Sequence, residues 1–155
     1  MYTYMYAIYV LKLEDNKYYV GKTLNVNKRI EQHFNGNGSV WTKRHNPISI
    51  CEIYWNVDKY DEDKYTEMYM EKYGIENVRG GSYSKIILEE SFINVLNKKF
   101  DTYNDRCYSC GKTGHFIKYC PNIKKKYKSK NSKKSKKNED TDSNEDTSSE
   151  SSKDI

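Results

Sequence analysis

The C-terminal segment, residues 121–155, sets the first limit on what this chain can fold into. It contains almost nothing but Lys, Ser, Asn, Thr, Asp and Glu, with nine lysines between Lys124 and Lys137 and an acidic, serine-rich end after them. Such a composition offers too little apolar surface to offset the entropy lost when the chain becomes ordered. We therefore expect residues 121–155 to be disordered and the folded part to precede them.

The preceding residues leave room for one small domain and one short module. Hydrophobic residues make up only 35% of the chain, yet there are 16 tyrosines, so phenol rings must supply much of the core. We expect a domain at residues 1–100, a linker at 101–106 and a cysteine-rich module at 107–120.

Membrane and disulfide signals are lacking in the sequence. No apolar run approaches the roughly 18 residues of a membrane span, and no charged-then-apolar leader begins the chain. Three cysteines belong to one pattern and Cys51 stands alone, so no disulfide framework is expected. These features predict a soluble, intracellular protein that does not contact membranes.

Apolar spacing in the first third predicts a hairpin and a helix. Residues 4–13 and 18–22 are rich in β-branched and aromatic side chains and are separated by a polar turn. Asn25 can cap a helix whose apolar residues recur at every fourth position, namely Val26, Ile30 and Phe34.

The rest of the domain predicts one more strand and two more helices. We expect a strand at residues 48–57, a helix at 61–73 that ends at Gly74, and a last helix at 88–96. The predicted fold class is α+β, with a small, three-stranded, mainly antiparallel sheet flanked by helices.

Four residues near the N-terminus are spaced to meet at one point. Tyr9 and Tyr19 lie on the two hairpin strands, Arg29 follows on the helix, and His33 comes one helical turn later. Phosphodiester hydrolysis needs an activated water and a cation at the phosphoryl oxygens, and a guanidinium suits two such oxygens. A phenol acts as a base only if nearby positive charge favours the phenolate, which Lys22 and Arg29 would supply.

Segments 7–9 (Ala-Ile-Tyr) and 19–21 (Tyr-Val-Gly), in register with Arg29 and His33, resemble the catalytic core of the GIY-YIG nuclease family. The sequence has Ala7 where the family has the first glycine of its name. The resemblance implies a metal-dependent endonuclease that acts on DNA.

The resemblance also implies a role for each residue. Tyr9 would be the general base and Tyr19 would orient the attacking water. Arg29 would clamp the scissile phosphate, and His33 would assist proton transfer.

A catalytic Mg²⁺ or Mn²⁺ needs a carboxylate from the helix at residues 61–73. Helical phase places Glu62 on the face of three tyrosines, which we expect to pack on the sheet, and on this ground Glu62 is preferred. The family's usual spacing favours Glu67 instead, if Asn77 is the asparagine that follows this glutamate in the family. Segments 61–66 and 73–81 look like a subgroup of large DNA viruses, which would place the protein in the nucleus or a viral replication compartment.

Further nucleic-acid contacts are predicted after the glycine-rich segment. Trp41 beside Lys43 and Arg44 can stack on a base while the cations meet the backbone, or the tryptophan can pack under its own loop. Arg79 either meets a phosphate or belongs to a turn that requires glycine geometry.

The cysteine-rich module has the ligands of a closed tetrahedral zinc shell, which makes the site structural. Its three thiols and one imidazole follow the pattern Cys107-x2-Cys110-x4-His115-x4-Cys120. This stretch resembles the CCHC zinc knuckle, which binds single-stranded nucleic acid. Tyr108 and Phe116 would then stack on unpaired bases.

The sequence as a whole predicts a metal-dependent DNA endonuclease. The zinc knuckle and the lysine run would help to bind DNA, with single-stranded or branched substrates favoured and RNA also open as a ligand. The alternative is a non-catalytic protein with a degenerate nuclease fold that binds single-stranded DNA or RNA.

Overall fold

The computed structural model describes residues 5–123, which form two compact units, one ending at Asn104 and one beginning at Asp105. The sequence predicted disorder for residues 121–155, and all but the first three of these lie outside the described residues.

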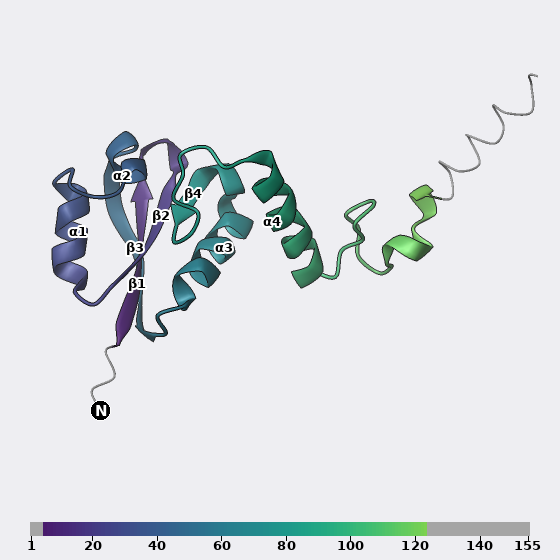
Figure 1. Ribbon diagram of the computed structural model, residues 1–155, viewed down its shortest axis with the longest axis horizontal. Helices are drawn as coiled ribbons and strands as arrows, with labels where there is room; N and C mark the ends of the chain where they lie inside the picture. The colour runs from purple at the N-terminus through teal and green to yellow at the C-terminus, as the bar shows by residue number, and fades with distance from the viewer. Residues whose placement is uncertain (1–4, 124–155) are drawn as a thin grey trace, which may run out of the picture. The chain divides into compact units, whose positions relative to one another are not determined.

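A four-stranded mixed sheet forms the centre of the first unit (Figure 1). Strands β1 (Tyr6–Leu13) and β2 (Tyr18–Thr23) make the predicted hairpin, closed by a short 3-10 turn. Strand β3 (Pro47–Val57) runs antiparallel to β1, and β4 (Val78–Gly80) runs parallel to β2. The strand order is therefore β3-β1-β2-β4.

The fourth strand was not predicted. It is only three residues long and ends in a glycine pair that the sequence indicates as a turn. Such a strand forms because β2 offers a free edge, which is a tertiary effect that local propensity does not show.

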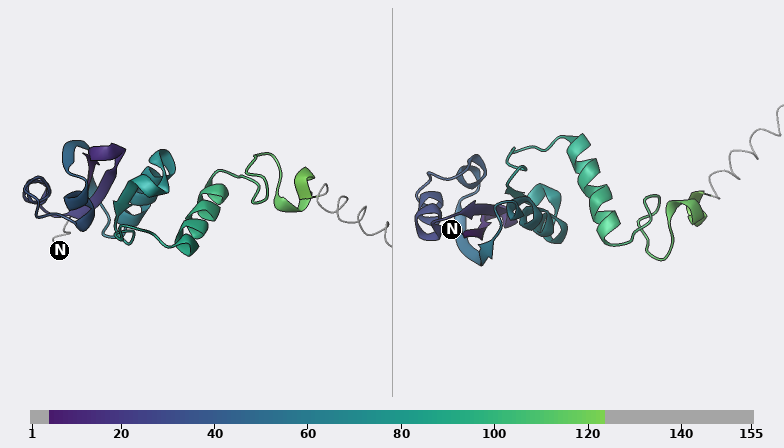
Figure 2. Two further views of the ribbon diagram at one scale, coloured as in Figure 1. Left: turned by 90° about the horizontal axis from the view of Figure 1, so that it is seen from above. Right: turned by 60° about the horizontal axis from the view of Figure 1, so that its bottom comes forward.

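Helices cover both faces of the sheet, and further views keep this arrangement (Figures 1 and 2). Helices α1 (Val26–Phe34) and α2 (Val40–Arg44) lie on one face. Helices α3 (Asp61–Tyr73) and α4 (Glu90–Tyr103) lie on the other. The α+β prediction is confirmed, with one strand and one short helix more than expected.

Strand alternation divides the core between the two faces. Ile8 and Val10 of β1 point to the α3 and α4 side, whereas Tyr9 and Leu11 point to the α1 and α2 side. Phenol rings contribute as expected, since Tyr18 stacks on the ring of α3 residue Tyr73 at 4.2 Å.

Local signals set some of the helix ends. The Asn25 side chain accepts a hydrogen bond from the Lys28 amide at 3.1 Å and caps α1, as predicted. Gly74 ends α3 with a φ of 98°, a backbone conformation that favours glycine. Helix α4 begins and ends later than predicted, so residues 101–103 of the expected linker are helical.

Candidate active site and metal centre

Tyr9 and Tyr19 lie side by side on the α1 face of the sheet. Their ring centroids are 6.2 Å apart, and both side chains are buried. Tyr9 pairs with Gly21 across the hairpin, and a Cβ built on Gly21 would lie 2.3 Å from the Tyr9 hydroxyl oxygen. Only glycine leaves room at this position for the Tyr9 ring to lie against β2.

His33 completes a buried cluster with the two phenols. Its Nε2 lies 2.8 Å from the Tyr9 hydroxyl, and its Nδ1 lies 2.8 Å from the Thr42 hydroxyl of α2. Burial, and secondarily the charge of Arg29, lower the pKa of His33 to about 4. The imidazole is therefore neutral at pH 7, with one ring nitrogen able to accept a hydrogen bond.

Arg29 lies one turn before His33 and is half-buried, with Nη1 donating to Gln32 at 3.0 Å. Burial raises the pKa of both Tyr9 and Tyr19, and the positive charge of Arg29 opposes this rise without cancelling it. The expectation that nearby cations make Tyr9 a phenolate is thus wrong for the protein alone, because desolvation outweighs the guanidinium.

Glu62, in the first turn of α3, contacts Lys22 at the end of β2. Its Oε1 accepts from the Lys22 amide at 3.2 Å, and its Oε2 lies 3.7 Å from the Lys22 ammonium. The charge of Glu62 contributes to the raised pKa of Tyr9 and Tyr19, so the carboxylate acts on both phenols.

Glu62 also lines a cavity of about 300 Å³ together with Lys22, Asp63 and Gly81. Its carboxylate is partly exposed there. Mg²⁺ commonly binds to one or two carboxylates and completes its shell with water and substrate phosphate, so one accessible carboxylate fits such an ion.

Glu67 lies elsewhere. Its Oε1 accepts hydrogen bonds from the Tyr83 hydroxyl and the Lys99 ammonium, each at 2.7 Å, and the side chain is buried. The phase argument expected Glu62 on the packed face of α3, whereas the structure buries Glu67 and leaves Glu62 partly exposed. The reason is that Lys99 of α4 binds Glu67, and the periodicity of α3 alone gives no information about α4.

Asn77 is not brought to the cluster. Its amide donates to the Tyr73 carbonyl at 2.7 Å, and its oxygen accepts from the Lys17 ammonium at 2.6 Å. Asn77 therefore lies beyond the C-terminal end of α3, whereas Glu62 lies at the N-terminal end.

Trp41 and Arg79 form a buried pair rather than a nucleic-acid surface. The Arg79 guanidinium lies 4.7 Å from the Trp41 ring centroid, and the Trp41 indole donates to the Tyr18 carbonyl at 3.0 Å. Arg79 donates to the backbone carbonyls of four residues: Ile75, Val78, Lys85 and Ile86. The packed alternative for Trp41 is the correct one, and Arg79 holds loop backbone instead of a phosphate.

Lys43 and Arg44 are exposed in the last turn of α2. They remain able to meet a nucleic-acid backbone without the stacking that Trp41 was expected to add.

Sequence reasoning missed Thr42 and Gly38, which hold His33. Thr42 is buried against the His33 ring, and a Cβ on Gly38 would lie 2.1 Å from His33 Nδ1. The glycine-rich segment was interpreted only as a helix break. The available signal was the short sequence spacing between His33 and Gly38, because a glycine lets the backbone approach a neighbouring ring closely.

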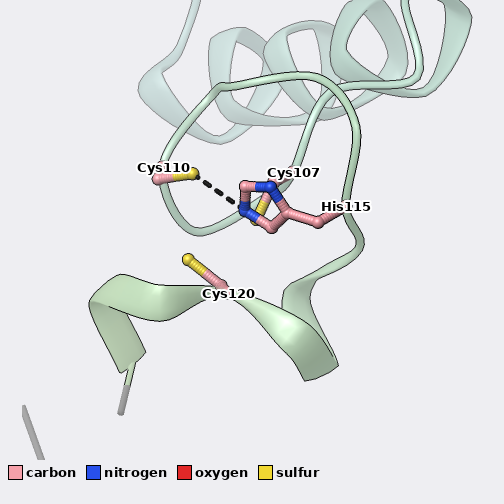
Figure 3. Close-up of side chains that lie close together, drawn as sticks. All are labelled: Cys107, Cys110, His115 and Cys120. Atoms are coloured by element: carbon pink, nitrogen blue, oxygen red, sulfur yellow. Dashed lines mark hydrogen bonds between the residues drawn. The ribbon is translucent and has the colours of Figure 1, made fainter. Parts of the chain in front are cut away.

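The second unit gathers three thiols and one imidazole (Figure 3). The ligand atoms all lie within 4.8 Å of one another, and tetrahedral Zn–S bonds of about 2.3 Å would place them about 3.8 Å apart. A small contraction therefore suffices, and the donor set fits a structural zinc ion. The four residues are Cys107, Cys110, His115 and Cys120.

Two glycines shape the loop that carries these ligands. Gly111 and Gly114 have φ values of 68° and 85°, and nothing lies within 4 Å of a Cβ built on either. Glycine is favoured here for its backbone conformation rather than for close packing.

Aromatic side chains around the zinc ligands are exposed. Tyr108 is 55% exposed and Phe116 is 71% exposed, and their stacking on bases stays a prediction. Tyr119, which the sequence did not single out, is 64% exposed and lines a cavity of about 400 Å³ with Phe116 and His115.

The fold and these two sites define a class of protein, an α+β domain with a buried Tyr–His pair joined to a small Cys3His module. Residues 5–104 match the model of the GIY-YIG catalytic domain, and residues 105–122 match that of the zinc knuckle. Because the first match covers well over half of the chain, the protein belongs to the GIY-YIG family.

Several bacterial proteins are similar to the first unit. A UPF0213 protein of Clostridium perfringens is 31% identical over 93 residues, which span 60% of this chain and 99% of that protein. A UPF0213 protein of Bacillus cereus is 34% identical over 68 residues, or 44% of this chain and 66% of that protein. No solved structure matches the chain significantly. The likeness to a viral subgroup stays a prediction.

Within residues 5–123, the helices are too short or too polar to cross a membrane.

Proposed function

We propose that this protein is a divalent-metal-dependent endonuclease that hydrolyses DNA phosphodiester bonds. One observation carries the proposal: buried Tyr9 lies 2.8 Å from His33 Nε2, the charges of Arg29 and Glu62 both act on it, and Glu62 lines a cavity. Family membership supports the same chemistry, since a catalytic domain is what the matching model describes.

Tyr9 is placed to take a proton from the attacking water only if its own proton can leave. The raised pKa of Tyr9 makes the free phenolate rare, but neutral His33 lies 2.8 Å away as an acceptor. We assign Tyr9 as the group that receives the water proton and His33 as the group that takes the phenol proton. Tyr19, in ring contact with both, would orient the water.

Arg29 supplies the fixed positive charge of the site. A guanidinium can donate to two phosphoryl oxygens at once and stabilise the charge that grows on them. Glu62 would hold Mg²⁺ or Mn²⁺, which adds Lewis-acid stabilisation when bound. Lys22, whose ammonium now lies near Glu62, would be released toward the phosphate.

The zinc knuckle would supply the substrate preference. Exposed rings at Tyr108 and Phe116 favour unpaired bases, because stacking requires the face of a base to be open. We therefore propose flaps, branches or other DNA with single-stranded character as preferred substrates, with Lys43 and Arg44 as backbone contacts.

A cleavage assay tests the activity. Supercoiled plasmid and a panel of duplex, single-stranded, flap and branched DNAs are incubated with the full chain and Mg²⁺ or Mn²⁺. We expect cutting that Tyr9→Phe and Glu62→Gln each reduce by about 100-fold or more. Glu71→Gln, on an exposed part of α3, is the matched control and should retain activity.

Glu67→Gln separates the two candidate carboxylates. If Glu62 holds the metal, Glu67→Gln lowers the melting temperature but keeps metal-dependent cutting, because Glu67 bonds only Tyr83 and Lys99 in the described residues. Loss of cutting in Glu67→Gln at a temperature where the variant is folded would move the metal to Glu67.

The second candidate function is non-catalytic binding of single-stranded DNA or RNA. The observation that favours it is the exposure of the knuckle rings, with Phe116 71% exposed. If no substrate of the panel is cut, while Phe116→Ala weakens binding to labelled single-stranded oligonucleotides, this function replaces the nuclease.

A further inference from the structure

Thr42 is an unusual neighbour for a buried imidazole. It lies in the five-residue helix α2 with only 1% of its surface exposed, although it carries a hydroxyl. Its Oγ1 lies 2.8 Å from His33 Nδ1 and donates to the Ser39 carbonyl at 3.1 Å. Buried hydroxyls normally have hydrogen-bond partners. The partners of the Thr42 hydroxyl also bear on which nitrogen of His33 carries the proton.

Counting protons from the Thr42 side gives one result for His33. A threonine hydroxyl has a single proton, and a carbonyl oxygen can only accept. With that proton on the Ser39 carbonyl, the Thr42 oxygen accepts from His33, so Nδ1 carries the hydrogen, and the Ser39 hydroxyl 3.3 Å away donates to the second lone pair of Thr42.

Counting from the Tyr9 side gives the same result. Tyr9 is protonated, and Arg29, which can only donate, interacts with the phenol oxygen. The phenol proton must then point to an acceptor, and His33 Nε2 lies 2.8 Å away. In a neutral imidazole an accepting Nε2 means that the proton is on Nδ1.

We propose that Thr42 is a positioning residue that fixes the Nδ1-protonated tautomer of His33, so that Nε2 is ready to receive the proton of Tyr9. The catalytic consequence rests on the proposed nuclease function, whereas the tautomer does not.

Gly38 lies close to the same edge of the ring as Thr42. A Cβ there would lie 2.1 Å from His33 Nδ1, 2.5 Å from the Thr42 hydroxyl oxygen and 2.8 Å from His33 Cγ. The ring is thus seated between Gly38, Thr42 and Tyr9, with a hydrogen-bond partner at each nitrogen.

In the proposed hydrolysis step, each proton that leaves one group is accepted by another. A water proton passes to the Tyr9 oxygen while the phenol proton passes to His33 Nε2, and the hydroxide forms a bond to phosphorus. The bond from phosphorus to the leaving oxygen breaks, and that oxygen takes a proton from solvent. The imidazolium formed is faced by Tyr9, Tyr19, Arg29 and Thr42, and it returns its proton to solvent through Tyr9 after product leaves.

Nitrogen-15 NMR of the full chain labelled at histidine tests the tautomer without any substrate. The His33 signals are identified by their loss in His33→Asn, because the chain has three histidines. At pH 7 we expect Nδ1 to be protonated and Nε2 to be unprotonated. Thr42→Val, which keeps the shape but removes the hydroxyl, should shift the tautomer toward Nε2–H, and Thr42→Ser should restore the original one.

Cleavage by the same variants tests the consequence. We expect kcat to fall by about 10- to 100-fold in Thr42→Val, with KM within about twofold, and to recover in Thr42→Ser. Thermal unfolding of each variant shows that it is folded at the assay temperature.

The outcomes are distinct. Protonation at Nε2 in the wild-type protein, or an unchanged tautomer and kcat in Thr42→Val, would overturn the assignment. If the tautomer behaves as expected and the wild-type protein cuts no DNA, the nuclease proposal fails while the control of His33 by Thr42 stands.

Discussion

Gly21→Ala is the substitution whose effect the structure defines most sharply. The added Cβ would lie 2.3 Å from the Tyr9 hydroxyl oxygen, 2.4 Å from Tyr9 Cζ and 2.9 Å from Tyr19 Cε1. Ordinary van der Waals contact needs about 3.4 Å or more, so the Tyr9 ring must move by about 1 Å. Tyr9 is fully buried, and no open space receives it.

Two effects on stability oppose each other in this variant. Overpacking a core costs about 1–3 kcal/mol, whereas replacing glycine in an ordinary backbone conformation gains about 0.4–1 kcal/mol. Gly21 is not among the described residues with positive φ, so the gain applies. The net loss should be about 1–2 kcal/mol, which lowers the melting temperature by roughly 5–10 °C for a domain of this size.

The effect on cleavage should be larger than the effect on stability. A displacement of about 1 Å in a catalytic group can cost about 100-fold in rate, and Tyr9 moves by that amount relative to His33. Circular dichroism measures the melting temperature, and plasmid nicking below it measures the rate.

Two further variants test the cause. Tyr9→Leu removes the two closest contacting atoms and leaves only the Tyr19 contact at 2.9 Å, so Gly21→Ala should cost much less stability in that background. Gly36→Ala is the matched control, because Gly36 has a φ of 76° with nothing within 4 Å; it should destabilise through backbone strain and leave cutting intact. An unchanged melting temperature and rate in Gly21→Ala would refute the reasoning.

Three other predictions follow from buried groups. Arg79→Met removes four hydrogen bonds to backbone carbonyls and should lower the free energy of unfolding by about 2–4 kcal/mol in urea titrations. His33 has a pKa of about 4 against an ordinary 6.5, so the unfolded chain binds more protons between these values. Stability should therefore fall by up to about 3 kcal/mol as the pH is lowered through this range, and the dependence should weaken in His33→Asn. Cys120→Ser should no longer bind zinc at the Cys3His site, and mass spectrometry of the variant would show the loss of one zinc ion per chain. The melting temperature of residues 5–104 should change little.

Local periodicity explains why much of the site was predictable. Strand alternation and one helical turn were enough to bring Tyr9, Tyr19, Arg29 and His33 onto one face, because each step involves neighbours in sequence. The zinc ligands were predictable for the same reason, since all four lie within one short loop.

What could not be predicted depends on parts of the chain that are distant in sequence. Arginine is usually a surface residue. Only the fold shows that loop carbonyls surround Arg79 beside Trp41. Thr42 was missed because its role is set by a ring nine positions earlier and by a helix too short to leave a periodic signal.

The choice between Glu62 and Glu67 depends on where a carboxylate for the proposed metal ion would have to lie in this fold. Helix α1 brings Arg29 and His33 to one face of the sheet, and α3 lies on the other, so groups from both helices can meet only where β2 ends, near Lys22. The first turn of α3 lies there, as the hydrogen bond from the Lys22 amide to Glu62 shows. A helix rises about 1.5 Å per residue, which carries Glu67 about 7.5 Å further along the axis and under α4. Position along α3, rather than its helical phase, therefore favours Glu62 over Glu67 as the carboxylate of the proposed nuclease.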